Sequence, residues 1–292
     1  MAFTGRRSCG SQREAEMIIR AGYTISFQCP APTPMLLQLN VHPSRECDLI
    51  SPDLVRVHPD TPTDSYIDLF GNRVTRVEAP AGLVTFTNDF AIRDSGLPDE
   101  VAEDAPLTAV KDLPTETLVF LLASRYCDSD SLSDFAWSRF GGVSGGARIV
   151  QAICDFVHDS IRFDYQLADP RRTASGALKE GVGVCRDFAH LAIALCRARN
   201  VPARYCTGYL GDIGVPPDPA PMDFSAWFEA FVNGRWYAFD ARHNVPRIGR
   251  IVMARGRDAA DTALSTAFGT APLQRFEVTT YDEATASNLP RG

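Results

Sequence analysis

Alternating apolar and polar residues characterise the first third of the chain. Residues 23–29, 37–41 and 73–78 alternate in this way, which is the pattern of half-buried β-strands. A turn-like triplet, Phe70-Gly71-Asn72, lies between two of these runs. The pattern therefore predicts a β-rich region at the N-terminal end.

Helical periodicity appears later in the chain. Apolar side chains recur at three- and four-residue steps in two segments, which are Ile149, Ile153, Phe156, Val157 and Ile161, and then Phe188, Leu191, Ala192, Leu195 and Cys196. Such spacing places side chains on one face of an α-helix. Strands are predicted afterwards at 203–210, 226–232, 235–240 and 274–280, with Asn233-Gly234 as a hairpin turn. Helices followed by antiparallel strands favour the α+β fold class over a parallel sheet.

A connector separates the two patterns. Proline and acidic residues are frequent between residues 94 and 114, and a chain of 292 residues is long enough for two domains. We therefore expect a disordered leader at 1–16, a β-rich N-terminal domain at 17–110 and a second domain at 111–292.

Composition narrows the classes of partner. The chain is 45% hydrophobic and 22% charged, with a net charge of −7, so it has no electrostatic basis for binding nucleic acid or an anionic membrane. It contains neither a bilayer-spanning apolar run nor a signal peptide, which predicts a cytoplasmic location. The eight cysteines are scattered, as is typical of reduced thiols.

Cys185 lies in the first turn of the second predicted helix. A helix N-terminus carries unpaired N–H groups and a partial positive charge, and Arg186 adds a full positive charge, so both are expected to favour a thiolate. The alternative is that Cys185 is a small buried apolar side chain. A nucleophilic thiol also needs a base and a group that orients the base.

Three motifs resemble those of the transglutaminase-like superfamily. They are Gly-Val-Cys-Arg-Asp-Phe-Ala at 183–189, Ala-Trp-Phe-Glu at 226–229 and Trp-Tyr-Ala-Phe-Asp at 236–240. From residue 20 to its end, the chain is similar to bacterial proteins that join a β-rich N-terminal region to a papain-like core. The resemblance implies helices packed on an antiparallel sheet, and a Cys-His-Asp triad in which Cys185 is the nucleophile and Asp240 orients the imidazole.

The sequence departs from this family at the base. The family pattern has histidine directly before Ala226-Trp227, whereas this chain has Ser225. A serine hydroxyl does not accept a proton near neutral pH. His243, three residues after Asp240, is the candidate substitute base. His190 lies about 140° around the helix from Cys185 and is expected to point away from it.

Two classes of function follow from the resemblance. In the first, Cys185 attacks a peptide or carboxamide carbonyl, N–H groups at the helix start stabilise the oxyanion, and the acyl-thioester passes to water or an amine. The protein is then a protease, an amidase or a transglutaminase. In the second, the loss of the histidine leaves a weak or inactive protein that binds a peptide or a partner protein. A third possibility is that the β-rich region docks to a partner.

Further residues are assigned around this site. Trp227 and Arg186 are expected to contact the substrate, which is a peptide or protein. Five arginines lie between residues 242 and 257, namely Arg242, Arg247, Arg250, Arg255 and Arg257. They either bind a substrate carboxylate or form surface salt bridges, and we favour the salt bridges. No metal spacing and no dinucleotide or phosphate loop is found, so we expect no metal and no cofactor. The oligomeric state is left open.

Overall fold

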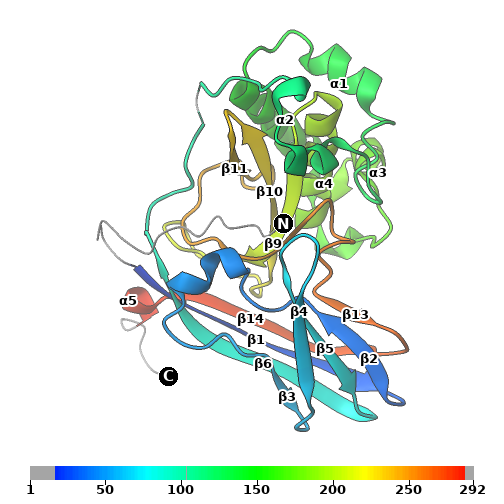
Figure 1. Cartoon of the computed structure of the whole chain (residues 1–292), viewed down its shortest axis with the longest axis vertical. Coiled ribbons are helices and arrows are strands. Elements are labelled where there is room, and N and C mark those ends of the chain that lie inside the picture. Colours follow the sequence, from blue (N-terminus) through cyan, green and yellow to red (C-terminus); the bar gives the residue numbers. More distant parts are fainter. Residues whose placement is uncertain (1–16, 103, 287–292) are drawn as a thin grey trace.

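The computed structural model describes residues 17–286 except residue 103. The chain forms a β-rich part and a part in which helices cover a sheet (Figure 1). The expected α+β class, with a β-rich region preceding a helix-and-sheet core, is confirmed. The expected leader at 1–16 lies outside the described residues.

Two four-stranded antiparallel sheets make up the β-rich part, in the orders β14-β1-β6-β3 and β13-β2-β5-β4. The strands are β1 (Met17–Cys29), β2 (Thr33–Leu37), β3 (Arg56–His58), β4 (Thr63–Ile67), β5 (Arg73–Ala79), β6 (Gly82–Asp94), β13 (Ser265–Ala267) and β14 (Leu273–Asp282). One apolar core joins them, and it includes Ile19, Tyr23 and Ile25 of β1. Their alternate spacing places these three side chains on one face of β1.

The sheet pairings decide where the end of the chain lies. β14 pairs with β1 and β13 pairs with β2, so residues 265–282 complete the β-rich part (Figure 1). The boundary near residue 110 grouped these residues with the second domain. Strand pairing of this kind joins segments about 250 residues apart, which a local pattern does not reveal.

One predicted strand ends early. The alternating run at 37–41 is strand only as far as Leu37. Beyond it, the N–H of Val41 and the amide of Asn40 donate to Asp53. The buried backbone therefore finds its hydrogen bonds in a loop instead of a sheet.

Four helices and a sheet of order β11-β10-β9-β12 make up the second part. The elements are α1 (Ser133–Phe140), α2 (Gly146–Ser160), α3 (Ala174–Glu180), α4 (Cys185–Ala198), β9 (Ala203–Tyr209), β10 (Ser225–Val232), β11 (Arg235–Phe239) and β12 (Ile251–Gly256), with the short parallel pair β7 (Arg162–Phe163) and β8 (Val182–Gly183). A further short helix, α5 (Glu283–Ala286), packs against β1 and β14 of the β-rich part. Asn233 and Gly234 turn β10 into β11 with φ of 50° and 80°, as the hairpin motif predicts. Within residues 17–286 apart from 103, no helix is long and apolar enough to cross a bilayer.

The start of α4 is fixed by a buried carboxylate. Asp187 Oδ2 accepts from the N–H of Val184 at 2.9 Å and from Arg172 Nη1 at 3.1 Å. Gly183 makes this approach possible, because a Cβ there would lie 2.6 Å from the Cβ of Asp187. Gly183 thus lets Asp187 cap the helix, which begins at Cys185.

Aromatic packing connects the two parts at the start of β10. The ring of Phe224 lies 5.0 Å from Tyr209, 5.8 Å from Phe276 and 6.1 Å from Tyr23, measured between centroids. Phe224 therefore belongs to the core of the β-rich part, although it directly precedes Ser225. The β-rich part fixes the position at which β10 begins.

Replacing Phe224 with leucine is expected to destabilise the protein by about 1–2 kcal/mol, because it removes buried carbon and leaves a gap among the three rings. Urea unfolding measures this loss. Phe268→Leu is the control, since Phe268 is 63% exposed. Equal unfolding midpoints for the two variants would show that Phe224 does not join the parts.

Candidate active site

Cys185 is the first residue of α4 and is partly exposed. Removal from water raises the pKa of its thiol to about 11, although the guanidinium of Arg242 and the backbone N–H groups of Ala226 and Arg186 oppose this shift. Asp223 raises the pKa further. Desolvation thus outweighs the helix terminus and opposes the expected thiolate.

The side chain of Arg186 is engaged elsewhere. Its Nη2 donates to the carbonyl of Asp169 at 2.7 Å, and its Nε lies 3.7 Å from Asp187 Oδ1. Arg242, not Arg186, is the residue whose guanidinium lowers the pKa of Cys185. The structure thus gives Arg186 a role in holding the loop before α4, and its contact with a substrate stays a prediction.

Asp240 and His243 form a hydrogen-bonded pair. His243 Nδ1 donates to Asp240 Oδ2 at 2.9 Å, and Oδ1 accepts the backbone N–H groups of Arg242 and His243, each at 3.0 Å. With Nδ1 as donor, the other ring nitrogen of His243 is left as a proton acceptor. The three-residue spacing from Asp240 to His243 therefore produces an oriented imidazole.

A buried arginine also binds the same carboxylate. Arg250 Nη2 lies 3.0 Å from Asp240 Oδ2, and Arg250 Nε donates to Asp99 Oδ2 at 2.7 Å. Burial alone would raise the pKa of Asp240, but the hydrogen bond from His243 and the charge of Arg250 hold it well below its usual range. Asp240 is therefore ionised at neutral pH and can stabilise an imidazolium.

Ser225 is the first residue of β10 and is buried. Its hydroxyl has no hydrogen-bond partner among the described residues. The position that holds histidine in the family pattern thus contributes no base. The imidazole bonded to Asp240 comes instead from the loop after β11.

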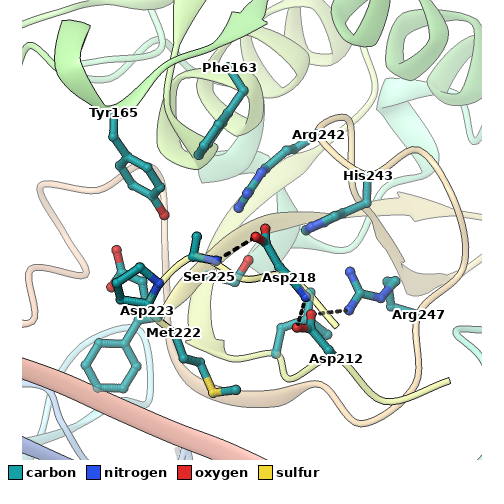
Figure 2. A pocket seen from close by; sticks show the side chains of 14 residues that line it. Phe163, Tyr165, Asp212, Asp218, Met222, Asp223, Ser225, Arg242, His243 and Arg247 are labelled. Carbon is teal, nitrogen blue, oxygen red and sulfur yellow. Dashed lines mark hydrogen bonds and ion pairs between the residues drawn. The ribbon is translucent and has the colours of Figure 1, made fainter. Parts of the chain in front are cut away.

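A pocket of about 220 Å³ lies at the start of β10, next to the loop that follows β11. In Figure 2 its upper side is formed by Phe163, Tyr165, Arg242 and His243, and its lower side by Asp212, Met222, Asp223 and Arg247. Arg242 and Asp223 of this lining both shift the pKa of the Cys185 thiol, so the thiol lies within their electrostatic reach. Ser225 and His243 line the same pocket.

Two other residues singled out from the sequence lie away from this pocket. Trp227 is 2% exposed and packs with Cys206 and Val252, so its ring supports the sheet here, and its contact with a substrate stays a prediction. His190 is fully buried, and its Nε2 accepts from the N–H of Ala259 at 3.1 Å. Its burial and this hydrogen bond give His190 a structural role in the core.

Sequence reasoning missed two groups of the pocket. Asp223 lies in the loop before β10 and Tyr165 begins a short 3-10 helix, and no motif or spacing distinguishes either residue in the sequence. In the described part of the chain, no group of three His, Cys, Asp or Glu side chains is placed to hold a metal ion. The absence of a metal and of a cofactor remains a prediction.

Comparisons with known proteins agree with this fold. Residues 138–241 match the sequence profile of the transglutaminase-like superfamily. A crystal structure of a candidate cysteine protease from Cytophaga hutchinsonii is 29% identical with a TM-score of 0.81, and the match covers 92% of each chain. An uncharacterized protein of Mycobacterium leprae is 25% identical over 218 residues, which are 72% of this chain and 77% of that protein. The chain therefore contains a domain of the transglutaminase-like superfamily, and it shares its fold, β-rich part included, with the Cytophaga protein.

Proposed function

We propose that the protein is a cysteine hydrolase or acyltransferase acting on peptide or carboxamide substrates. The Cys185 sulfur attacks the carbonyl carbon while the imidazole of His243 accepts the thiol proton. The imidazolium then gives this proton to the leaving amine as the C–N bond breaks. Water or a second amine attacks the acyl-thioester, and its proton passes through His243 back to the Cys185 sulfur.

The Asp240–His243 pair at the pocket carries this proposal. A thiol whose pKa is about 11 is almost entirely protonated at neutral pH. Attack by its sulfur therefore requires a base, and His243 lines the pocket with its ring oriented by Asp240 at 2.9 Å. The similarity to a candidate cysteine protease supports a peptide substrate.

The start of α4 supports the oxyanion step. The first N–H groups of a helix have no partner within it, and the capping by Asp187 holds this turn in place. These N–H groups can stabilise the negative charge that develops on the carbonyl oxygen. Hydrolysis and amine transfer share this step, and both remain within the proposal.

Alkylation of individual cysteines tests the proposal. Cys47 is exposed and unpaired, so it provides an internal reference. With iodoacetamide at pH 7 and peptide mass spectrometry, we expect Cys185 to be labelled faster than Cys47, because base assistance is available only at Cys185. The variant Cys185→Ala confirms the peptide assignment. Labelling of Cys185 more slowly than Cys47 would reject the proposal.

The buried hydroxyl of Ser225 favours a second function, that of a binding module without catalysis. Here the domain keeps its fold and pocket but transfers no proton from Cys185. The same labelling experiment separates the two, since slow labelling of Cys185 is the result that a binding module predicts. The packing of Phe224 in the β-rich part supports a structural role for that part over an independent docking module.

A further inference from the structure

Arg242 differs from the other four arginines between residues 242 and 257. Four of the five form ion pairs, which are Arg247 with Asp212, Arg250 with Asp99 and Asp240, Arg255 with Glu229, and Arg257 with Asp261. Arg242 has no carboxylate within ion-pair distance among the residues that the structure describes. Its guanidinium lies instead over the ring of Phe163, 3.9 Å from the centroid, and lines the pocket.

The same pocket holds a carboxylate without a cation. Asp223 is partly buried, and burial raises its pKa, while the N–H of Phe224 and the charge of Arg242 lower it. In the described part of the chain, Asp223 takes part in no ion pair. Arg242 and Asp223 lie on different sides of the pocket (Figure 2), so they do not neutralise each other by contact.

The other charges of the pocket are paired or exposed to solvent. Asp212 lies 3.8 Å from Arg247 and accepts the N–H of Asp218 at 2.7 Å. The carboxylate of Asp218 accepts the N–H of Ala220 at 2.9 Å and is exposed to solvent, which screens its charge. Among the described residues that line the pocket, Arg242 and Asp223 are therefore the partly buried charges without an ion pair.

Arg242 is held in place before any ligand binds. Its backbone N–H donates to Asp240 Oδ1 at 3.0 Å, and its carbonyl is hydrogen-bonded to His158 Nδ1 at 2.9 Å. Stacking on Phe163 orients the guanidinium further. A guanidinium fixed in this way binds a carboxylate through two parallel N–H donors at a reduced entropic cost.

We propose that the pocket selects short peptides with both ends free, binding the carboxylate at Arg242 and the ammonium group at Asp223. The inference rests on the proposed function, because Arg242 and Asp223 both act on the Cys185 thiol, which is the group that would attack the peptide bond between the two charges. The volume of about 220 Å³ is below the range of about 300–1,000 Å³ that drug-sized ligands occupy. It suits a substrate of dipeptide size.

Protection of Cys185 from alkylation tests this selectivity without requiring turnover. The probes are alanyl-alanine, its N-acetyl form, its C-terminal amide and the form with both ends blocked. In the wild type, alanyl-alanine slows labelling of Cys185 by iodoacetamide at the lowest concentration. Each blocked end weakens this protection by about tenfold or more, since it removes a hydrogen bond between charged groups.

Two variants assign each end to its residue. In Arg242→Gln, amidation of the C-terminus no longer matters, while N-acetylation still weakens protection. In Asp223→Asn the pattern is reversed. Arg139→Gln is the matched control, because Arg139 also lies over an aromatic ring, that of Phe156 at 5.4 Å, but outside the pocket. It is expected to behave as the wild type.

The possible failures are distinguishable. Equal protection by the free and doubly blocked peptides, or no protection by any of them up to about 10 mM, well above common substrate constants, overturns this inference alone. If Arg242→Gln still prefers the peptide with a free C-terminus as strongly as the wild type does, this inference is also overturned. Slow labelling of Cys185 relative to Cys47 in the absence of peptide rejects the proposed function instead, and protection can still be measured on the slow reaction.

Discussion

Replacing His243 with alanine is expected to lower the rate at which Cys185 is acylated by about 10²–10⁴-fold, the usual contribution of a general base. The structure supports this effect because Asp240 orients the imidazole at 2.9 Å and no other histidine lines the pocket within the described chain. Burst kinetics with an activated ester, or the rate of Cys185 alkylation, measures it.

The pH dependence of Cys185 alkylation distinguishes base-assisted attack from attack by the free thiolate. In the wild type, the base accepts the thiol proton, so the sulfur reacts at pH values well below the thiol pKa of about 11. Without the base, the sulfur reacts only as a thiolate, so the rate continues to rise toward the thiol pKa of about 11. The midpoint of the profile in His243→Ala therefore moves to higher pH.

A second-site change makes this prediction specific. Ser225 lines the same pocket and occupies the position of the family histidine, so adding Ser225→His to His243→Ala is expected to restore part of the rate. His58→Ala is the control, because His58 is exposed in β3 of the β-rich part. An unchanged rate and profile in His243→Ala would show that another group takes the proton.

Replacing Glu229 with glutamine is expected to destabilise the protein by about 3–5 kcal/mol, as found when one partner of a buried ion pair is removed. Glu229 lies in β10 and accepts from Arg204 Nε at 2.6 Å and Arg255 Nη2 at 3.1 Å. Arg255 also contacts His42, whose pKa burial lowers to about 3. A neutral glutamine leaves two guanidinium groups with no counter-charge at this contact between the parts.

Acid unfolding tests the same carboxylate. Burial would raise the pKa of Glu229, but Arg255 and Arg204 lower it to about 2 from the ordinary 4.5. The folded-state pKa is depressed, so its contribution of about 3 kcal/mol is present above pH 4.5 and is lost as the pH falls toward 2. Urea unfolding between pH 7 and 2 is expected to show this loss in the wild type and not in Glu229→Gln.

An exposed ion pair provides the control for this change. Glu277 and Arg275 are about half exposed in β14, and Glu277→Gln is expected to leave the unfolding midpoint unchanged at pH 7. Equal midpoints for the Glu229 and Glu277 variants would contradict a stabilising role for the ion pairs of Glu229 with Arg204 and Arg255. A lowered midpoint of Glu229→Gln with normal labelling of Cys185 would show that these ion pairs stabilise the fold without affecting the site.

Several elements of the site are visible in the sequence because they depend on neighbours along the chain. The apolar spacing after Cys185 predicts α4, and Asn233-Gly234 predicts the hairpin of β10 and β11. The short separation of Asp240 and His243 places the imidazole within reach of the carboxylate. These relations hold within one turn or one hairpin, so periodicity and turn chemistry are enough to reveal them.

Charge and burial at the site depend on distant segments. Asp187 and Asp169 engage Arg186, while the loop after β11 brings Arg242 to Cys185. Surrounding groups remove the thiol from water and so favour its protonated form. No local sequence motif predicts this desolvation. The tertiary packing likewise buries Trp227 in the sheet.

By itself, the sequence determined the class of the fold and the helix that begins at Cys185, and it named His243 as a candidate for the missing base. Only the tertiary structure decided that residues 265–282 complete the β-rich part, that Phe224 ties that part to the site, and that Arg242 and Asp223 face one pocket. The physical reason is range: backbone propensity and side-chain periodicity act over a few residues, whereas strand pairing, desolvation and the electrostatic field arise from segments that meet only in the folded chain.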